Sequence, residues 1–195
     1  TSKEALKIAL YRIVFEEFLI LQLGLFMFKN GTTEVEGIKF NRDENLDNIL
    51  KALPFKLTNA QNRALNEIIE DMQSNKVMNR LVQGDVGSGK TVVALLALAN
   101  CVLNGYQGAL MAPTEILAEQ HYISLSETLK PFGMEIELLV GSLTKKQKEK
   151  VLERVKNKEI DILIGTHALI EDKVEFNNLG IVITDEQHRF GVRQR

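Results

Sequence analysis

An eight-residue stretch in the first half of the chain fits the pattern G-x-x-x-x-G-K-[ST]. It consists of Gly84, Asp85, Val86, Gly87, Ser88, Gly89, Lys90 and Thr91. Leu81 and Val82 before it predict a strand, and the apolar run from Val92 onward predicts a helix. Glycines at such a turn let backbone N–H groups converge on phosphate oxygens, and the helix N-terminus adds positive potential. We therefore expect all eight residues to bind ATP, with Lys90 reaching the β and γ phosphates and Thr91 ligating Mg²⁺.

From about residue 55 onward, short β-type runs alternate with helical patterns. Strands are predicted at 80–83, 109–112, 136–140, 160–165 and 181–185, and helices at 58–74, 90–104, 115–130 and 144–157. Strands that alternate with helices form βαβ units, so we expect an α/β fold with a parallel sheet covered by helices on both faces. In such sheets ligands bind at the carboxyl ends of the strands.

The first thirty residues have a different pattern. Apolar residues at helical spacing predict a long helix from Ser2 to about Phe28, with Asn30-Gly31 as its stop. Beyond Val14 this helix is apolar nearly all round, so we expect it to pack on several sides, against a partner that other parts of a longer protein would supply. Residues 31–54 are predicted to be a linker that contains a short helix, and 55–195 the main domain.

Composition excludes several classes of protein. The longest apolar run has only about half of the roughly 20 residues that a membrane span needs. The formal net charge of -2 and the pI of about 6.0 give no global sign of nucleic-acid binding, which would have to come from local patches. A single cysteine, Cys101, and the lack of a signal segment indicate a reducing, cytoplasmic setting. The histidines, His121, His167 and His188, have no metal-ligand spacing, so no zinc site is predicted.

Two acidic residues, Asp185 and Glu186, directly follow the last predicted strand. Next to a phosphate loop, Asp185 is expected to hold the Mg²⁺ ion and Glu186 to polarise the attacking water. The alternative is a pair of solvated acids at a strand end, which is a common pattern when it occurs alone. The phosphate loop favours the catalytic interpretation.

Gln61 admits two interpretations. Thr58 and Gln61 have the spacing of a capping box, which would start a helix. Alternatively, the Gln61 amide could present its donor and its acceptor to an adenine edge, while Phe55 offers a face for stacking. The spacing alone favours the cap.

The motifs together resemble the first half of a helicase of the second superfamily, and more specifically the bacterial RecG family. The segments that carry the resemblance are Gln61, residues 81–91, residues 111–121, Gly165-Thr166-His167 and residues 185–192. Residues 11–25 resemble the helix that joins the DNA-binding wedge domain of that family to its motor. The resemblance covers nearly the whole chain and implies a RecA-like P-loop NTPase domain, the first of two motor domains.

The resemblance also implies roles that spacing alone does not. Ala112, Pro113, Thr114, Glu115, Gly165, Thr166 and His167 would line a DNA path. Gln187 and His188 would couple the nucleotide state to that path and to the second motor domain, and Gln61 would read adenine. Without the resemblance, Thr114 would be a helix cap, Pro113 a turn residue and His167 a polar loop residue.

The activity implied is that of an ATP-dependent DNA helicase, with ATP and Mg²⁺ as cofactors and branched DNA, such as replication forks and Holliday junctions, as substrate. The implied protein is monomeric, cytoplasmic and associated with the nucleoid. We expect the sequence to be a piece that lacks the second motor domain and its arginine finger, and therefore to hydrolyse ATP poorly alone. The alternatives are a transcription-repair coupling translocase, disfavoured by Ser88 and Gln187, and a nucleotide-binding regulatory switch.

A basic stretch at 145–158 contains seven lysines and arginines. Glu149 and Glu153 within it and Glu159 directly after it reduce its net positive charge. It could contact DNA phosphates, but a solvated helix face is the commoner meaning of this pattern.

Overall fold

A parallel sheet of four strands, in the order β2-β3-β1-β4, forms the centre of the α/β body. The computed structural model describes residues 3–32, 36–171 and 174–185. The strands are β1 (Gln107–Met111), β2 (Ile136–Leu139), β3 (Ile162–Gly165) and β4 (Leu179–Thr184). At the carboxyl end of β1, Met111 lies opposite both Gly165 of β3 and Thr184 of β4. Three neighbouring strands therefore end together at one edge of the sheet.

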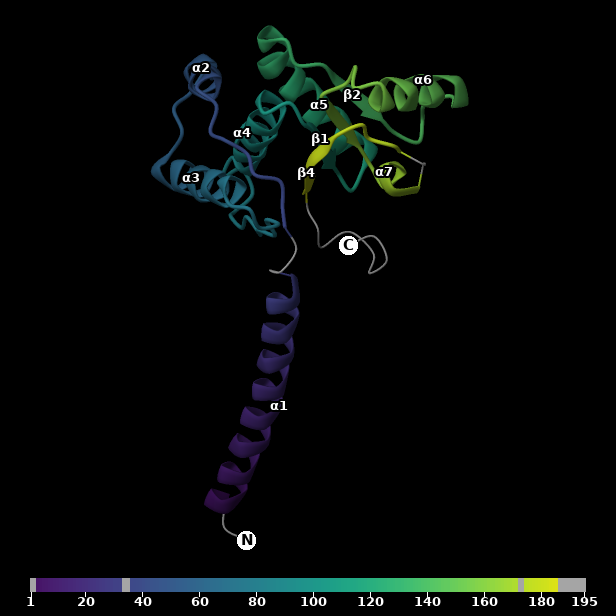
Figure 1. Cartoon of the computed structure of the whole chain (residues 1–195). Helices are drawn as coiled ribbons and strands as arrows, with labels where there is room; N and C mark the ends of the chain where they lie inside the picture. Colours follow the sequence, from purple (N-terminus) through teal and green to yellow (C-terminus); the bar gives the residue numbers. More distant parts are fainter. Residues whose placement is uncertain (1–2, 33–35, 172–173, 186–195) are drawn as a thin grey trace.

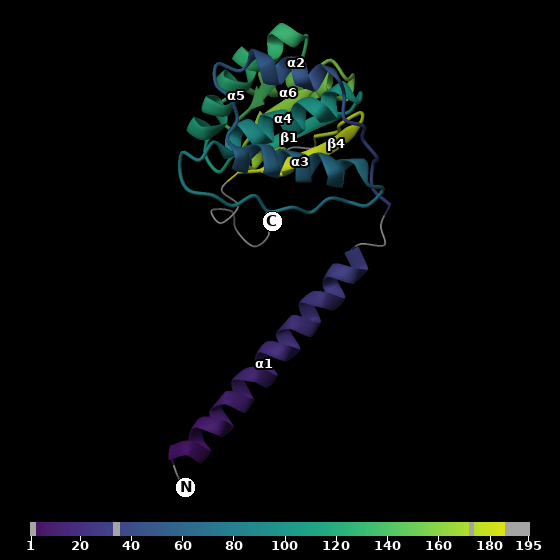
Figure 2. The same cartoon turned by 90° about the vertical axis from the view of Figure 1, so that its left-hand side faces the viewer.

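Helices cover both faces of this sheet, as the alternating pattern predicts. They are α2 (Asn45–Ala52), α3 (Asn59–Gln73), α4 (Lys90–Leu103), α5 (Glu115–Leu129), α6 (Lys145–Lys156) and the short α7 (Ala168–Glu171), with a 3₁₀ turn at Lys130–Phe132. Buried side chains of α2 to α5 form one core cluster with the sheet, and those of α6 form a second. In Figure 1 the strands accordingly lie between α4 and α6, and Figure 2 shows α2, α3 and α4 in front of the sheet. Cys101 is buried in α4, where burial raises the pKa of its thiol to about 12.

The predicted strand at 80–83 is wrong. These residues have no strand conformation, and no backbone hydrogen bond joins them to β4 in the described parts of the chain. Arg80 instead donates to Glu67 Oε2 at 2.7 Å and to Asp71 Oδ2 at 2.6 Å, which holds the segment beside α3. Leu81 is 77% exposed. An apolar run forms a strand only when its backbone is hydrogen-bonded to a neighbouring strand. Residues 80–83 lie beside α3 instead.

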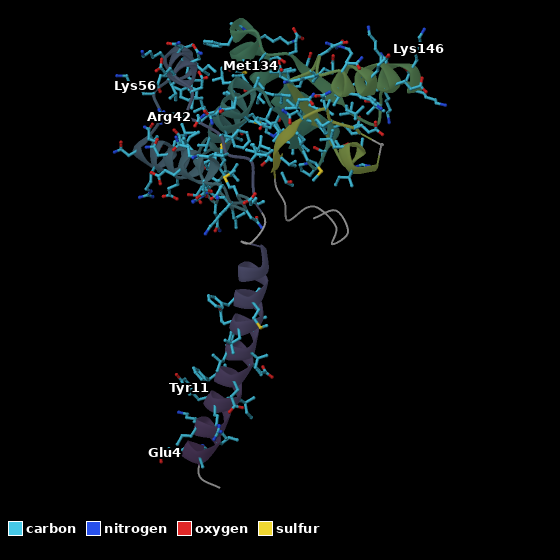
Figure 3. The ribbon with its side chains drawn as sticks, viewed as in Figure 1. Glu4, Tyr11, Arg42, Lys56, Met134 and Lys146 are labelled. Atoms are coloured by element: carbon cyan, nitrogen blue, oxygen red, sulfur yellow. The ribbon has the colours of Figure 1, made fainter. Side chains whose placement is uncertain are left out.

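The long first helix, α1 (Lys3–Thr32), extends away from the α/β body (Figure 1). It continues through Gly31, so the predicted stop at Asn30-Gly31 is wrong; a glycine ends a helix only where it leaves the helical conformation. The apolar side chains whose burial is described on α1 are exposed, as Figure 3 shows for Tyr11, and the expected packing on several sides is not made by the described residues. Within the described parts of the chain, no helix combines the length and the apolarity that crossing a membrane requires.

Part of the predicted linker at 31–54 packs into the body. Phe40 and Leu46 are buried in the first core cluster, and the rings of Phe40 and Tyr106 form a T-shaped pair with a centroid distance of 5.2 Å. Asn104, which directly follows α4, holds the backbone of Asn41 through two hydrogen bonds of 2.8 Å. This part of the predicted linker is therefore attached to α4, the helix that follows the phosphate loop.

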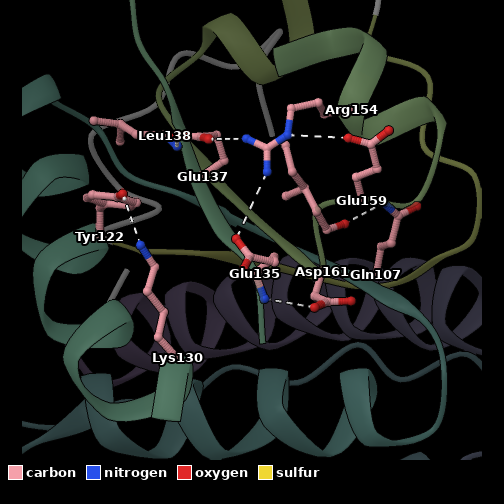
Figure 4. Close-up of polar contacts among 10 residues, drawn as sticks. Gln107, Tyr122, Lys130, Glu135, Glu137, Leu138, Arg154, Glu159 and Asp161 are labelled. Carbon is pink, nitrogen blue, oxygen red and sulfur yellow. Dashed lines mark hydrogen bonds and ion pairs between the residues drawn. The ribbon is translucent and has the colours of Figure 1, made fainter. Parts of the chain in front are cut away.

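Two basic side chains near the end of α6, Arg154 and Lys156, make close ion pairs. Arg154 lies among Glu135, Glu137 and Glu159, with 2.6 Å between its Nη1 and Glu137 Oε2 (Figure 4). Lys156 pairs with a glutamate at 2.6 Å. These contacts join α6 to β2 and to the loops beside it, so the structure favours the interpretation of this stretch as a helix face with mainly structural pairing.

Gln107 joins three parts of the body from a fully buried position at the start of β1. Its Nε2 donates to Val155 O at 2.9 Å and to Ile160 O at 2.7 Å, while its Oε1 accepts from Asn178 N at 3.0 Å. Gln107→Leu would leave the buried carbonyl of Ile160 and the partly buried N–H of Asn178 without this partner. We expect it to lower the free energy of unfolding by about 2–4 kcal/mol.

Urea unfolding of the 195-residue chain, followed by circular dichroism, measures this change. Gln73→Leu, at an exposed position near the end of α3, is the matched control and should change stability by less than about 0.5 kcal/mol. Equal stability of the two variants would contradict the role given to Gln107.

Candidate nucleotide-binding site

The predicted phosphate loop runs from Gly84 into the first turn of α4. Gly87 and Gly89 have positive φ angles of 80° and 77°, a conformation that glycine adopts without strain. Lys90 begins α4, and its Nζ bends back over the loop to donate to Gly84 O at 2.8 Å and to Asp85 O at 2.9 Å. Val86 is fully exposed at the tip. The lysine ammonium is thus held over the loop by two neutral backbone carbonyl oxygens.

Gln61 contacts the loop directly. The capping box predicted for α3 is confirmed, because Gln61 Oε1 accepts from Thr58 N at 2.8 Å and the Thr58 hydroxyl accepts from Gln61 N. The other end of the Gln61 amide donates to Ser88 O at 2.9 Å. A Cβ atom at Gly89 would lie only 2.3 Å from Gln61 Nε2, so a glycine is needed for this approach. Phe55, the predicted stacking residue, is half exposed just before α3.

Asp185 directly follows β4 at the edge where three strands end. Its backbone N–H donates to Met111 O at 2.8 Å, which continues the pairing of β4 with β1 by one residue. Its carboxylate is 30% exposed and lies close to α5, where its Oδ2 is 2.8 Å from His121 Nε2. The other predicted residues of this motif, Glu186, Gln187 and His188, lie outside the described residues.

The phosphate loop and the acidic end of β4 line the same cavity, which has a volume of about 790 Å³. Its lining includes Gly84, Val86, Lys90, Thr91, His121 and Asp185. The hydroxyl of Thr91 and the carboxylate of Asp185 are hard oxygen ligands of the kind that Mg²⁺ prefers, and Mg²⁺ sites in proteins use few such ligands together with phosphates. The residues present therefore fit a magnesium-bound nucleotide. Sequence reasoning did not identify His121 as a neighbour of this site.

The segments predicted to line a DNA path leave the sheet at the same edge. Ala112 N donates to Gly165 O at 2.8 Å, so the turn after β1 and the turn after β3 lie side by side. The side chains of Ala112 and Thr166 are buried, whereas that of His167 is exposed. Ala112 and Thr166 could therefore face a ligand only through their backbone.

The turn after β1 also has local structural roles. The Thr114 hydroxyl accepts from Leu117 N at 3.3 Å and caps α5, as the spacing predicts. Glu115 Oε1 accepts from Ser142 N at 3.2 Å, which holds the loop after β2 against this turn. Pro113 directly precedes Thr114 and is partly exposed.

Comparison with known proteins is consistent with this geometry. A model of the DEAD/DEAH box helicase family matches residues 58–195. The chain is 55% identical, over its whole length, to the ATP-dependent DNA helicase RecG of Bacillus subtilis, and 54% identical, over 94% of its length, to that of Aquifex aeolicus. A solved structure of RecG bound to a three-way DNA junction matches 95% of this chain with a TM-score of 0.87 and 49% identity.

These matches cover only part of the larger proteins. The chain spans 29% of the Bacillus subtilis relative, 23% of the Aquifex aeolicus relative and 26% of the junction-bound RecG chain. A hypothetical RNA helicase of Sulfolobus tokodaii, at 21% identity and a TM-score of 0.57 over 75% of this chain, shares the fold. The expected α/β fold and the expected family are thus confirmed.

Proposed function

This chain belongs to the DEAD/DEAH box helicase family, and we propose that it is the nucleotide-binding part of a RecG-type DNA helicase that uses ATP to remodel branched DNA. The observation that carries the proposal is the cavity shared by Lys90, Thr91 and Asp185 at the edge where β1, β3 and β4 end. That edge is where ligands of parallel α/β sheets bind. The same edge holds the two turns that the RecG resemblance assigns to DNA.

In the proposed mechanism the loop from Gly84 to Thr91 surrounds the phosphates with backbone N–H groups. Lys90 exchanges its carbonyl partners for the β and γ phosphates, and Thr91 and Asp185 would hold a magnesium ion. Bound Mg²⁺ would neutralise charge that develops on the phosphate oxygens. Glu186 polarises the attacking water, and Gln61 and Phe55 bind the adenine.

Coupling to DNA uses the neighbouring turns. We assign residues 112–115 and 165–167 to the DNA path, and Gln187 and His188 to communication with a second motor domain of the same protein. The exposed side chains among them, such as His167, would contact the DNA directly. Since ATP and branched DNA are both intracellular, we infer a cytoplasmic protein. Because Phe40 and Leu46 belong to its core, we further propose that the motor begins before residue 55.

ATP hydrolysis by the full-length protein tests this function. We expect a three-way or forked DNA to stimulate turnover more strongly than linear duplex of the same length. Equal stimulation by linear duplex would favour a coupling-type translocase. The absence of any stimulation by DNA would contradict the helicase assignment and favour a regulatory nucleotide switch.

A further inference from the structure

A buried histidine lies behind the acidic end of β4. His121 belongs to α5, is only 8% exposed, and places Nε2 2.8 Å from Asp185 Oδ2. An ionised carboxylate can only accept hydrogen bonds, so the Nε2 atom carries the proton and donates it to Asp185. The mechanism described above gives this histidine no task, although it lines the same cavity as Lys90 and Thr91.

Both partners of this hydrogen bond are held in place by the fold. Ala118 and Leu125 lie on the same side of α5 as His121, one turn before and one turn after it, and both are fully buried in the core. The backbone of His121 is therefore held on the face of α5 that packs into the core. On the other side, the backbone of Asp185 is fixed by its hydrogen bond to Met111 O.

We propose that His121 is a positioning residue for magnesium ligation: its Nε2–H fixes the rotation of the Asp185 carboxylate at the edge of the nucleotide cavity. This inference rests on the proposed function, in which Asp185 holds the ion. A carboxylate held by a buried donor binds a metal without first losing rotational freedom. Hydrogen-bond partners of metal ligands typically change metal affinity by about 10- to 100-fold when they are removed.

Two substitutions separate positioning from packing. His121→Leu fills a similar space in the core but cannot donate a hydrogen bond. His121→Gln carries an amide NH₂ at about the reach of Nε2 and can donate to Asp185. Gln120→Leu, at the exposed neighbouring position, is the matched control, because it removes an amide from the same helix without touching Asp185.

The measurement is the affinity of the full-length protein for a fluorescent ATP analogue, in Mg²⁺ and in EDTA. In wild type and in Gln120→Leu, Mg²⁺ should tighten binding. In His121→Leu we expect this gain to fall by about 10-fold or more while the affinity in EDTA stays unchanged, and in His121→Gln most of the gain should return. Thermal unfolding of each variant monitors the fold.

Three results would overturn the inference. A full Mg²⁺ gain in His121→Leu would mean that Asp185 needs no help from the histidine. Equal losses in His121→Leu and His121→Gln, accompanied by equal falls in melting temperature, would mean that the ring only packs. If Mg²⁺ did not increase the affinity of the wild type for the ATP analogue, the proposed function would fail as well. The wild-type measurement alone distinguishes this outcome from the first two.

Discussion

Lys90→Ala should weaken ATP binding by the full-length protein by about 100-fold or more and leave the fold intact. In the structure the Lys90 ammonium donates to the carbonyl oxygens of Gly84 and Asp85. Phosphate oxygens would replace these neutral partners with charge-assisted hydrogen bonds, each worth about 1.5–3 kcal/mol. Without the ammonium, the phosphates would lose the cation that the loop directs towards them.

Titration with a fluorescent ATP analogue measures this loss, and circular dichroism checks the fold. The matched control is Lys146→Ala, which removes the same type of cationic side chain from an exposed position on α6 (Figure 3). It should bind the nucleotide like the wild type. If Lys90→Ala bound as tightly as this control, the loop would not be the phosphate site.

The sequence predicted those elements whose pattern is local. The helices α3, α4, α5 and α6 follow capping residues or a glycine turn and have helical periodicity, and each begins within about one residue of its expected start. The strand predicted at 80–83 is absent, because an apolar run forms a strand only where a neighbouring strand pairs with its backbone. Its apolar residues suit a strand, but the segment lies beside α3, where Arg80 pairs with Glu67 and Asp71.

In the candidate site, too, local sequence patterns were predictable and contacts between distant residues were not. The phosphate loop and Asp185 could be identified because each motif is contiguous, and the structure brings them to one cavity. The contact between His121 and Asp185 joins residues 64 positions apart, and a single histidine on an apolar helix has no spacing that signals it. Likewise, the spacing of Thr58 and Gln61 predicted the cap but not the hydrogen bond from Gln61 to Ser88 O, which exists only after α3 and the loop pack together.

Glu186→Gln should bind ATP nearly as the wild type does and lose about 100- to 10,000-fold in turnover, the range expected for removal of a general base. The amide keeps the size of the side chain but cannot take up a proton from water. Because the substitution removes a negative charge near the phosphates, it does not weaken the attraction between the site and ATP. Single-turnover hydrolysis in the presence of forked DNA, beside nucleotide titration, measures the two effects separately. Glu119→Gln on α5, an exposed position, is the matched control and should retain full turnover.

The contrast between Glu186→Gln and Lys90→Ala is the sharper test. If Lys90 binds phosphates and Glu186 acts on water, the first variant should be saturated with ATP and inactive, whereas the second should remain empty at the same concentration. Saturating ATP would then restore part of the turnover of Lys90→Ala but none of that of Glu186→Gln, because only the former has lost ground-state binding. Two variants with the same binding defect would show that the loop and the acidic strand end share one role, and the assignment of separate roles would be wrong.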